Sequence, residues 1–497
     1  MKKIIRLLLC TALLVTALWF LQRLLVPKYF GDVTEGAFTA EYYRDEPDHE
    51  VLFLGDCEAY ENFDPVYLWE HYGINSYIRG SAQQLVWQSY YMLEDALRYE
   101  TPKVVVMNVL AMKYNEPQSE AYNRITLEGM KWGLPKIRAI NASMTEEEHF
   151  IEYVFPLLRY HDRLFKLSSD DLKYMFKTER VSYNGYYLRV DTKPAENVPG
   201  GKQLTDYNFG DKAWKYMNMI ADLCEKKGID LILVKAPSLY PYWYSEWEEQ
   251  IEEYAAKRDL KYINYLELTE ETGLDLTEDT YDGGLHLNVY GADKITEHLG
   301  KVLSEEYGLT DRSGETELAA AWDEKIRLYY NEISRQLEEA KAGQTPEVTK
   351  TPEPTPGIKA PEPKTGGYIF SFKGVDVAMD AEAKALTKDM PEAKSVYEAP
   401  SCAFEGVDRV YDYGSFELNT YEVSGTEYVS AVIFKDDLVE TGEGAYIGMT
   451  IDEVEALYGS GTEEGNGRVY EKGGMKLRFF LKEGHVSQIQ YLSTILE

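Results

Sequence analysis

Cysteine, histidine and basic residues are scarce in this sequence. Four cysteines and seven histidines occur among 497 residues. No two cysteines form a CxxC pair, which leaves a zinc site or a thioredoxin-like redox motif without support. Lys and Arg number 52 against 85 Asp and Glu, for a formal net charge of −33. Because such an excess repels phosphate, we expect no nucleic-acid partner and no charge-driven adsorption to anionic lipid. We also expect no metal and no cofactor.

A long apolar run lies close to the N-terminus. Lys2, Lys3 and Arg6 precede the uninterrupted run Leu7–Leu21, and counting on to Val26 gives about the twenty residues that span a bilayer. The run has the length of a signal peptide, but no small-x-small cleavage site follows it. We therefore expect an uncleaved single-pass anchor in a bacterial cell membrane, with the bulk of the chain extracellular. Secretion after signal cleavage is the alternative.

A proline-rich stretch divides the chain. Gln344–Lys364 alternates Pro, Thr, Glu and Lys with almost nothing to bury, which is typical of an extended, semi-rigid spacer. The predicted division is an anchor over residues 1–28, an α/β domain over 29–343, a linker over 344–366 and an α+β module over 367–497.

The first region alternates apolar strands with amphipathic helices. Short continuous apolar runs at 51–54, 103–107, 230–234 and 261–264 are separated by helical patterns such as 83–98, 213–227 and 247–258. This alternation predicts a parallel sheet covered on both faces. Ligands of such sheets bind at the carboxyl ends of the strands. The stretch from Tyr122 to Gly210 has weak periodicity and is interpreted as an insertion or cap.

The C-terminal module contains an internal repeat. The sequence Arg409–Gly414 recurs as Arg468–Gly473, and each copy is followed by two strands of alternating polarity and preceded by a helix signal. The pattern resembles the tandem-repeat fold of beta-lactamase inhibitory proteins and related bacterial surface modules. That resemblance implies an α+β module that binds a protein or wall partner rather than a catalytic one.

Two short motifs place candidate reactive groups at strand ends. The first strand runs into Gly55-Asp56-Cys57-Glu58, and Asp282-Gly-Gly-Leu-His286 comes late in the first region. A nucleophile on a tight strand-to-helix turn exposes its side chain and leaves its own N–H available to an oxyanion. A late histidine can then exchange a proton with the nucleophile while Asp282 orients the imidazole.

These paired motifs resemble the SGNH, or GDSL-type, hydrolases. The resemblance covers about residues 51–303 and implies a three-layer, flavodoxin-like α/β fold. The anchor and the HLNxxGA run at His286–Ala292 are similar to the membrane-attached branch that includes teichoic-acid D-alanylation and alginate acetylation proteins. By the same resemblance, the N–H groups of Cys57 and Gly80 form the oxyanion hole.

The sequence departs from the family pattern at three places. Cys57 stands where the family usually has serine, so it is either a thiol nucleophile or a small structural residue. Asp282 lies four residues before His286 instead of three, and Asp279 is the substitute candidate. Asn108 and Asn115 both lack the expected Gly-x-Asn context, and Asn108 is the nearer to a strand end.

The combined expectation is an extracytoplasmic acyl esterase or acyltransferase. Its substrate would be the ester-linked acyl groups of a cell-surface polysaccharide or teichoic-acid-like polymer. Cys57, His286 and Asp282 are the candidate catalytic residues, and Gly80, Asn108 and Lys235 the candidate oxyanion or substrate-binding residues; Lys235 follows the strand at 230–234. The alternative is an inactive SGNH scaffold that binds glycan or a protein partner.

Overall fold

A parallel sheet forms the centre of the first region. The computed structural model describes residues 2–29, 33–165, 167–195, 198, 200–201, 203–341, 366–391, 393–400, 407–423, 426–464, 467–482 and 484–494. The sheet has five strands in the order β2-β1-β3-β4-β5, and all neighbours pair in parallel. The parallel α/β prediction is therefore confirmed. The strands are β1 (Val51–Gly55), β2 (Ser76–Gly80), β3 (Val104–Asn108), β4 (Asp230–Lys235) and β5 (Lys261–Asn264).

Helices cover both faces of this sheet. Successive residues of β1 point to opposite faces, with Leu52 and Leu54 in one buried cluster and Val51 and Phe53 in the other. The first face is covered by α5 (Val86–Ala96), α7 (Leu134–Ser143), α11 (Asp211–Lys227) and α12 (Ser245–Arg258). The second is covered by α3 (Cys57–Tyr60), α4 (Pro65–Tyr72), α14 (Val289–Glu305) and α15 (Thr316–Lys341).

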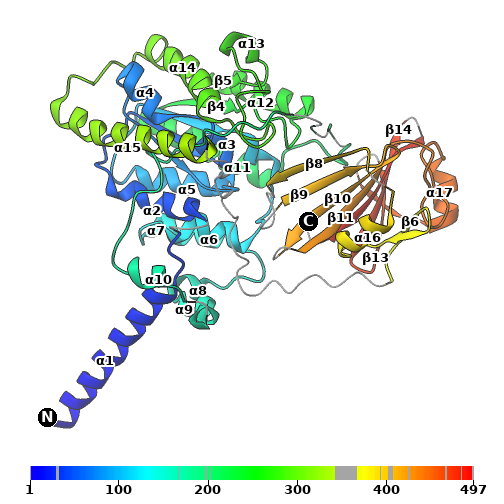
Figure 1. Ribbon diagram of the computed structural model, residues 1–497, viewed down its shortest axis with the longest axis horizontal. Helices are drawn as coiled ribbons and strands as arrows, with labels where there is room; N and C mark the ends of the chain where they lie inside the picture. The colour runs from blue at the N-terminus through cyan, green and yellow to red at the C-terminus, as the bar shows by residue number, and fades with distance from the viewer. Residues whose placement is uncertain are drawn as a thin grey trace.

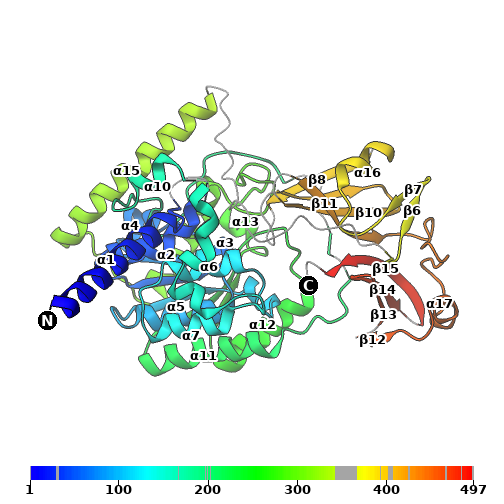
Figure 2. The same ribbon diagram turned by 90° about the horizontal axis from the view of Figure 1, so that it is seen from below.

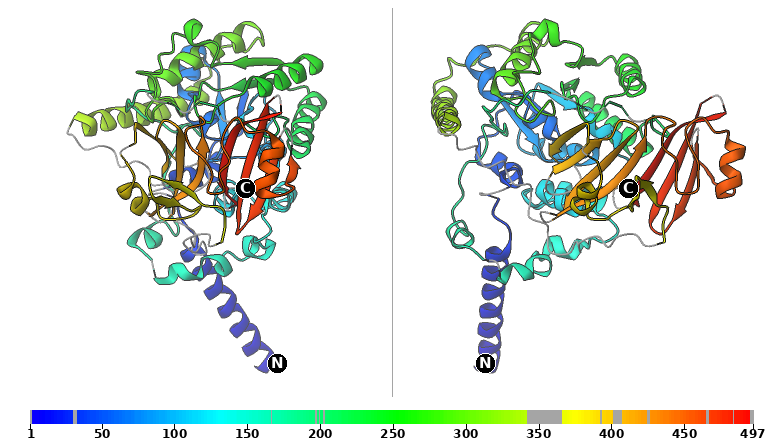
Figure 3. Two further views of the ribbon diagram at one scale, coloured as in Figure 1. Left: turned by 90° about the vertical axis from the view of Figure 1, so that its right-hand side faces the viewer. Right: turned by 45° about the vertical axis from the view of Figure 1, so that its right-hand side comes forward.

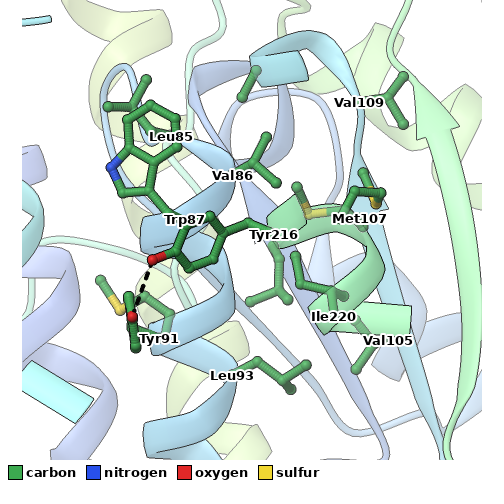
Figure 4. Packing of buried hydrophobic residues seen from close by; sticks show 14 of the residues in the cluster. Leu85, Val86, Trp87, Tyr91, Leu93, Val105, Met107, Val109, Tyr216 and Ile220 are labelled. Carbon is green, nitrogen blue, oxygen red and sulfur yellow. Dashed lines mark hydrogen bonds between the residues drawn. The ribbon is translucent and has the colours of Figure 1, made fainter. Parts of the chain in front are cut away.

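Figure 4 shows the packing on the first face. Trp87 of α5 and Tyr216 of α11 lie over strand residues that include Val105 and Met107. The Tyr91 and Tyr216 hydroxyls are 3.1 Å apart and hydrogen bonded. Burial of these large aromatic side chains fixes α5 and α11 against the sheet.

Shorter helices lie before β1 and between the strands. One group precedes β1: η1 (Thr34–Ala37), α2 (Phe38–Glu41) and η2 (Tyr42–Arg44). The helix η3 (Leu110–Lys113) follows β3. The stretch predicted as an insertion, Tyr122–Gly210, contains α7 and the short helices α6 (Glu120–Glu128), α8 (Phe150–Val154), α9 (Leu157–Tyr160), η4 (His161–Phe165) and α10 (Ser169–Lys173). The helix α13 (Thr269–Thr272) follows β5.

A single long helix projects from the α/β unit. The helix α1 (Lys2–Leu25) is long and apolar enough to cross a membrane, although a signal sequence would meet the same criterion. None of its most apolar stretch is buried against the protein, and Figure 1 shows it extending away from the body. The predicted N-terminal apolar helix is thus present.

The C-terminal region forms an eight-stranded antiparallel sheet. Its order, β12-β13-β14-β15-β11-β10-β9-β8, places four consecutive strands in each half, and β11 joins β15 at the centre. Figure 2 shows the two halves, one beside α16 (Ala383–Asp389) and the other beside α17 (Ile451–Tyr458). The strands are β8 (Ser395–Pro400), β9 (Val407–Asp412), β10 (Phe416–Val423), β11 (Thr426–Phe434), β12 (Thr462–Glu464), β13 (Gly467–Lys472), β14 (Met475–Lys482) and β15 (His485–Ser493), with a separate hairpin of β6 (Phe370–Phe372) and β7 (Val375–Val377).

Two sequence predictions fall outside the described residues. The proline-rich segment predicted as a linker, 344–366, contributes only Gly366 to the structure, and Cys402 also lies outside. The antiparallel character of the C-terminal module is confirmed, whereas the domain boundaries stay predictions.

Candidate active site

A glycine turn at the end of β1 presents Cys57. Gly55 has φ +153°, and a Cβ added there would lie 2.9 Å from Asn108 Cβ and 3.0 Å from Ala59 Cβ. Only glycine therefore allows β3 and α3 to approach this closely. Asp56 then caps α3, accepting a 3.2 Å hydrogen bond from the Glu58 N–H. Cys57 is the first residue of α3 and is half-buried at the carboxyl end of the sheet.

Asp282 holds the ring of His286. The Asp282 Oδ2 atom lies 2.7 Å from His286 Nδ1, and its Oδ1 accepts the His286 backbone N–H at 2.9 Å. Gly283 and Gly284 both adopt positive φ, +91° and +102°. These glycines absorb the extra residue in the Asp-to-His spacing. Both side chains are buried, and Asp279 instead pairs with Lys294 at 2.6 Å.

The surroundings of His286 favour its protonated form. Burial by itself lowers the pKa of His286, but the negative charges of Glu61, Cys57 and Asp282 outweigh burial and raise that pKa well above its usual value. The other ring nitrogen, Nε2, is buried and has no hydrogen-bond partner among the described residues. His286 is therefore bound to Asp282 through Nδ1, and its Nε2 remains available as a donor to a second group.

Glu61 is a neighbour of His286 that the sequence interpretation missed. Its Oε2 atom lies 3.6 Å from His286 Nδ1 and also accepts a hydrogen bond from the Tyr281 hydroxyl. Glu61 follows Cys57 by four residues, and its N–H donates to the Cys57 carbonyl at 3.0 Å. This i, i+4 spacing was the available signal, because it places both side chains on one helix face.

A second carboxyl group lies close to this cluster. Burial and the charge of Glu61 are among the causes that raise the pKa of Glu35 to about 7. The positive charge of Arg189 favours the ionised forms of Glu35 and Glu61. Its guanidinium carbon lies 5.0 Å from the centre of the Tyr281 ring. Asn62 accepts the Leu287 N–H at 2.8 Å, while its buried Nδ2 has no partner among the described residues.

Asn108 and Lys235, both predicted as oxyanion or substrate-binding residues, are engaged by neighbouring groups inside the protein. The Asn108 Nδ2 group donates to Asp56 and to Glu58, both at 3.1 Å, and its Oδ1 accepts the Ala236 N–H. Lys235 is fully buried and binds Glu58 at 2.8 Å. Buried polar groups satisfy one another because an unpaired one is costly. Both residues therefore support the turn that carries Cys57, and their predicted role in binding substrate stays a prediction.

Gly80 pairs with Gly55 at the ends of neighbouring strands, which brings it close to the Cys57 turn. A Cβ at Gly80 would lie 3.2 Å from the Gly55 carbonyl oxygen and 3.2 Å from the Tyr60 ring. A larger residue would press on α3.

The remaining cysteine of the α/β unit, Cys224, is buried in α11, and burial raises its pKa to about 12. Among these two thiols, Cys57 alone neighbours a histidine.

Comparison with known proteins gives little beyond this geometry. No protein-family model matches the chain, and no curated protein matches it. One solved structure that it resembles is a GDSL-like lipase from Bacteroides thetaiotaomicron, with 12% sequence identity over 55% of this chain and 100% of the lipase chain. The TM-score is 0.25. At that score the likeness assigns neither a family nor an activity to this chain.

Proposed function

We propose that the protein is a membrane-anchored acyl esterase or acyltransferase with Cys57 as nucleophile. The observation that carries this proposal is the hydrogen bond between Asp282 and His286 Nδ1, together with the electrostatic effect of Cys57 on His286. His286 is positioned by one carboxylate, and its pKa is raised partly by the Cys57 charge. A thiolate paired with an imidazolium is the reactive state of cysteine nucleophiles.

In the first half-reaction, the Cys57 thiolate attacks the carbonyl carbon of an ester. The oxyanion formed is stabilised by the N–H groups of Cys57 and Gly80. His286 donates its proton to the leaving alcohol oxygen as the carbon–oxygen bond breaks, which leaves an acyl thioester on Cys57 and a neutral imidazole.

In the second half-reaction, His286 takes a proton from the incoming hydroxyl. That oxygen attacks the thioester carbonyl, the carbon–sulfur bond breaks, and the thiolate is regenerated beside the imidazolium. Water as acceptor gives hydrolysis, whereas a sugar hydroxyl gives acyl transfer. An acyl-bearing cell-surface polysaccharide or teichoic-acid-like polymer fits an enzyme held outside the membrane by α1.

The test is acylation of the full-length protein by p-nitrophenyl acetate, followed by intact-mass measurement and peptide mapping. We expect one acetyl group on Cys57, faster than on glutathione, and no acetyl group on Cys224, whose buried thiol is the internal control. Cys57→Ser should remove rapid thiol acylation, and His286→Ala should slow acylation by about 10²–10⁴-fold.

The opposite result would favour a non-catalytic role. If Cys57 reacts no faster than glutathione and His286→Ala changes nothing, the nucleophile assignment fails. The scaffold would then be better interpreted as an inactive one that binds glycan or a protein partner.

A further inference from the structure

An exposed apolar surface lies in the segment that follows α7, from α8 to just beyond α10. Large apolar side chains are at least half exposed at six positions within 26 residues, a density unusual for a surface that faces only water. We call this surface the apolar base. Its members are Ile151, Phe155, Leu158, Leu164, Leu172 and Phe176.

The apolar base packs around the body-proximal end of α1. The helices α9, η4 and α10 all contact α1. The Phe176 ring lies 6.1 Å from Trp19 and 5.8 Å from Phe20, measured between ring centres. Figures 1 and 3 show these short helices gathered at the level where α1 meets the body.

Arginines fasten the same segment to the end of α1. The Arg23 guanidinium donates to the Met175 carbonyl and lies 5.3 Å from the Phe176 ring centre. Arg163 donates to the Leu25 carbonyl at 2.5 Å and pairs with Asp171 at 2.7 Å. The Leu25 carbonyl at the end of α1 thus has a partner from the segment that carries the apolar base, and this bond fixes the position of the segment along α1.

The contacts with α1 determine where the base would lie in a bilayer. Trp19 precedes Leu25 by six residues, which is about 9 Å along the helix axis. A hydrocarbon core of about 30 Å accommodates about twenty residues, and such a span starting after Arg6 ends near Val26. Phe176 contacts Trp19 and Phe20, so it would lie below the outer boundary of that core.

We propose that the apolar base is a second membrane contact, seated in the outer interface of the same bilayer that α1 spans. Short helices with apolar side chains on one side lie in this way at the headgroup boundary. The half-exposed Lys173 and Lys177 ammonium groups, which both pair with Glu179, can also reach the headgroups from the same segment. The proposal rests on the membrane location of α1 but on no chemistry at Cys57.

The partner is the lipid acyl region rather than an anionic surface. The chain carries a net charge of −33, which opposes adsorption to anionic lipid. Contact through exposed leucine and phenylalanine side chains needs no such attraction. Zwitterionic phosphatidylcholine is therefore the appropriate bilayer for the test.

The experiment is photolabelling of the full-length protein in phosphatidylcholine vesicles that contain a lipid with a diazirine on one acyl chain. After irradiation, peptides are mapped by mass spectrometry. We expect label in α1 and in residues 150–177. The control is Leu438 in the C-terminal module, which is 79% exposed and distant in sequence from α1; its peptide should remain unlabelled.

Two outcomes overturn the proposal and are distinguishable. Label in α1 without label in residues 150–177, or label equal to that at Leu438, overturns the apolar base alone. Absence of label from α1 overturns the membrane anchor and the base together. Neither outcome depends on whether Cys57 is acylated.

Discussion

The carboxylate of Glu61 favours the protonated form of His286, although Glu61 lies far from His286 in the sequence. The groups that face His286 are Cys57 and Glu61 from the turn after β1, with Asp282 and the Tyr281 ring from its own loop. Arg189 and Glu35 act on the cluster from its edge. Glu61 comes first among the charges that raise the pKa of His286. It therefore extends the pH range over which the imidazolium persists.

Replacing Glu61 tests this role. His286 is protonated below its raised pKa and loses its proton as the pH rises through that value. Glu61→Gln removes a negative charge, so the pKa of His286 falls and the alkaline limb of p-nitrophenyl acetate cleavage moves to lower pH. Above the new limit the rate should drop about tenfold for each pH unit.

The matched control is Glu46→Gln, which removes the same charge from an exposed position. Its alkaline limb should coincide with that of the unchanged protein. An alkaline limb that is unmoved in Glu61→Gln would show that Asp282 and Cys57 alone sustain the imidazolium.

Part of this site could be predicted from residue spacing alone. The Gly55 turn, Cys57 and the Asp282–His286 pair come together because a parallel sheet brings strand ends to one edge. The hydrogen bonds of Asn108 and Lys235 could not be predicted, because they join side chains of β3 and β4 to acidic groups in the turn after β1. Glu58 accepts from both residues, and nothing in its sequence context distinguishes it from an exposed acid.

At the scale of elements, a buried ion pair fastens α3 to the sheet. Glu58 of α3 and Lys235 of β4 are both buried, with 2.8 Å between Oε1 and Nζ. Lys235 also donates to the Ala236 carbonyl at 2.6 Å. Burial raises the pKa of the neighbouring Asp56 to about 6, with the charge of Glu58 as the next cause. Lys113 and Lys235 both favour the ionised form of Asp56, and Lys235 also pairs directly with Glu58 in the turn that carries Cys57.

Removing that cation should be costly. Lys235→Met leaves the Glu58 carboxylate buried without its partner, and we expect a loss of about 3–5 kcal/mol in the free energy of unfolding. Urea denaturation followed by circular dichroism measures it. Lys227→Met, on the exposed end of α11, should change stability by less than about 0.5 kcal/mol. Equal effects in the two variants would mean that the ion pair contributes nothing.

The elements of the α/β unit were predictable to different degrees. Four of the five strands were predicted to within a residue or two from short apolar runs, whereas β2, which includes Ser76 and Arg79, was not given a range. The region of α8 to α10 had weak periodicity for a physical reason. Its leucine and phenylalanine side chains face outward instead of forming a stripe toward one core.

At the scale of the whole molecule, the position of α1 predicts how the protein is extracted from cells. If α1 is an uncleaved anchor, alkaline carbonate should leave the full-length chain in the membrane pellet and detergent should release it. A variant with Leu13→Arg and Leu14→Arg adds about 2.5–3.5 kcal/mol per central charge to insertion and should be lost from the pellet. Recovery of the native chain in the wash, with an N-terminus beyond Val26, would instead identify a cleaved signal.

The order of strands in the C-terminal sheet has a consequence for biosynthesis. The strand β15 is the last of the eight strands to be synthesised, yet it occupies the centre, paired with β14 on one side and β11 on the other. Until residues 485–493 leave the ribosome, both neighbours carry unpaired edges of the kind that templates aggregation. The half β8–β11 precedes β15 in the chain, but its β11 edge stays unpaired until β15 joins it, and a chain arrested before β15 would be a substrate for chaperones and proteases.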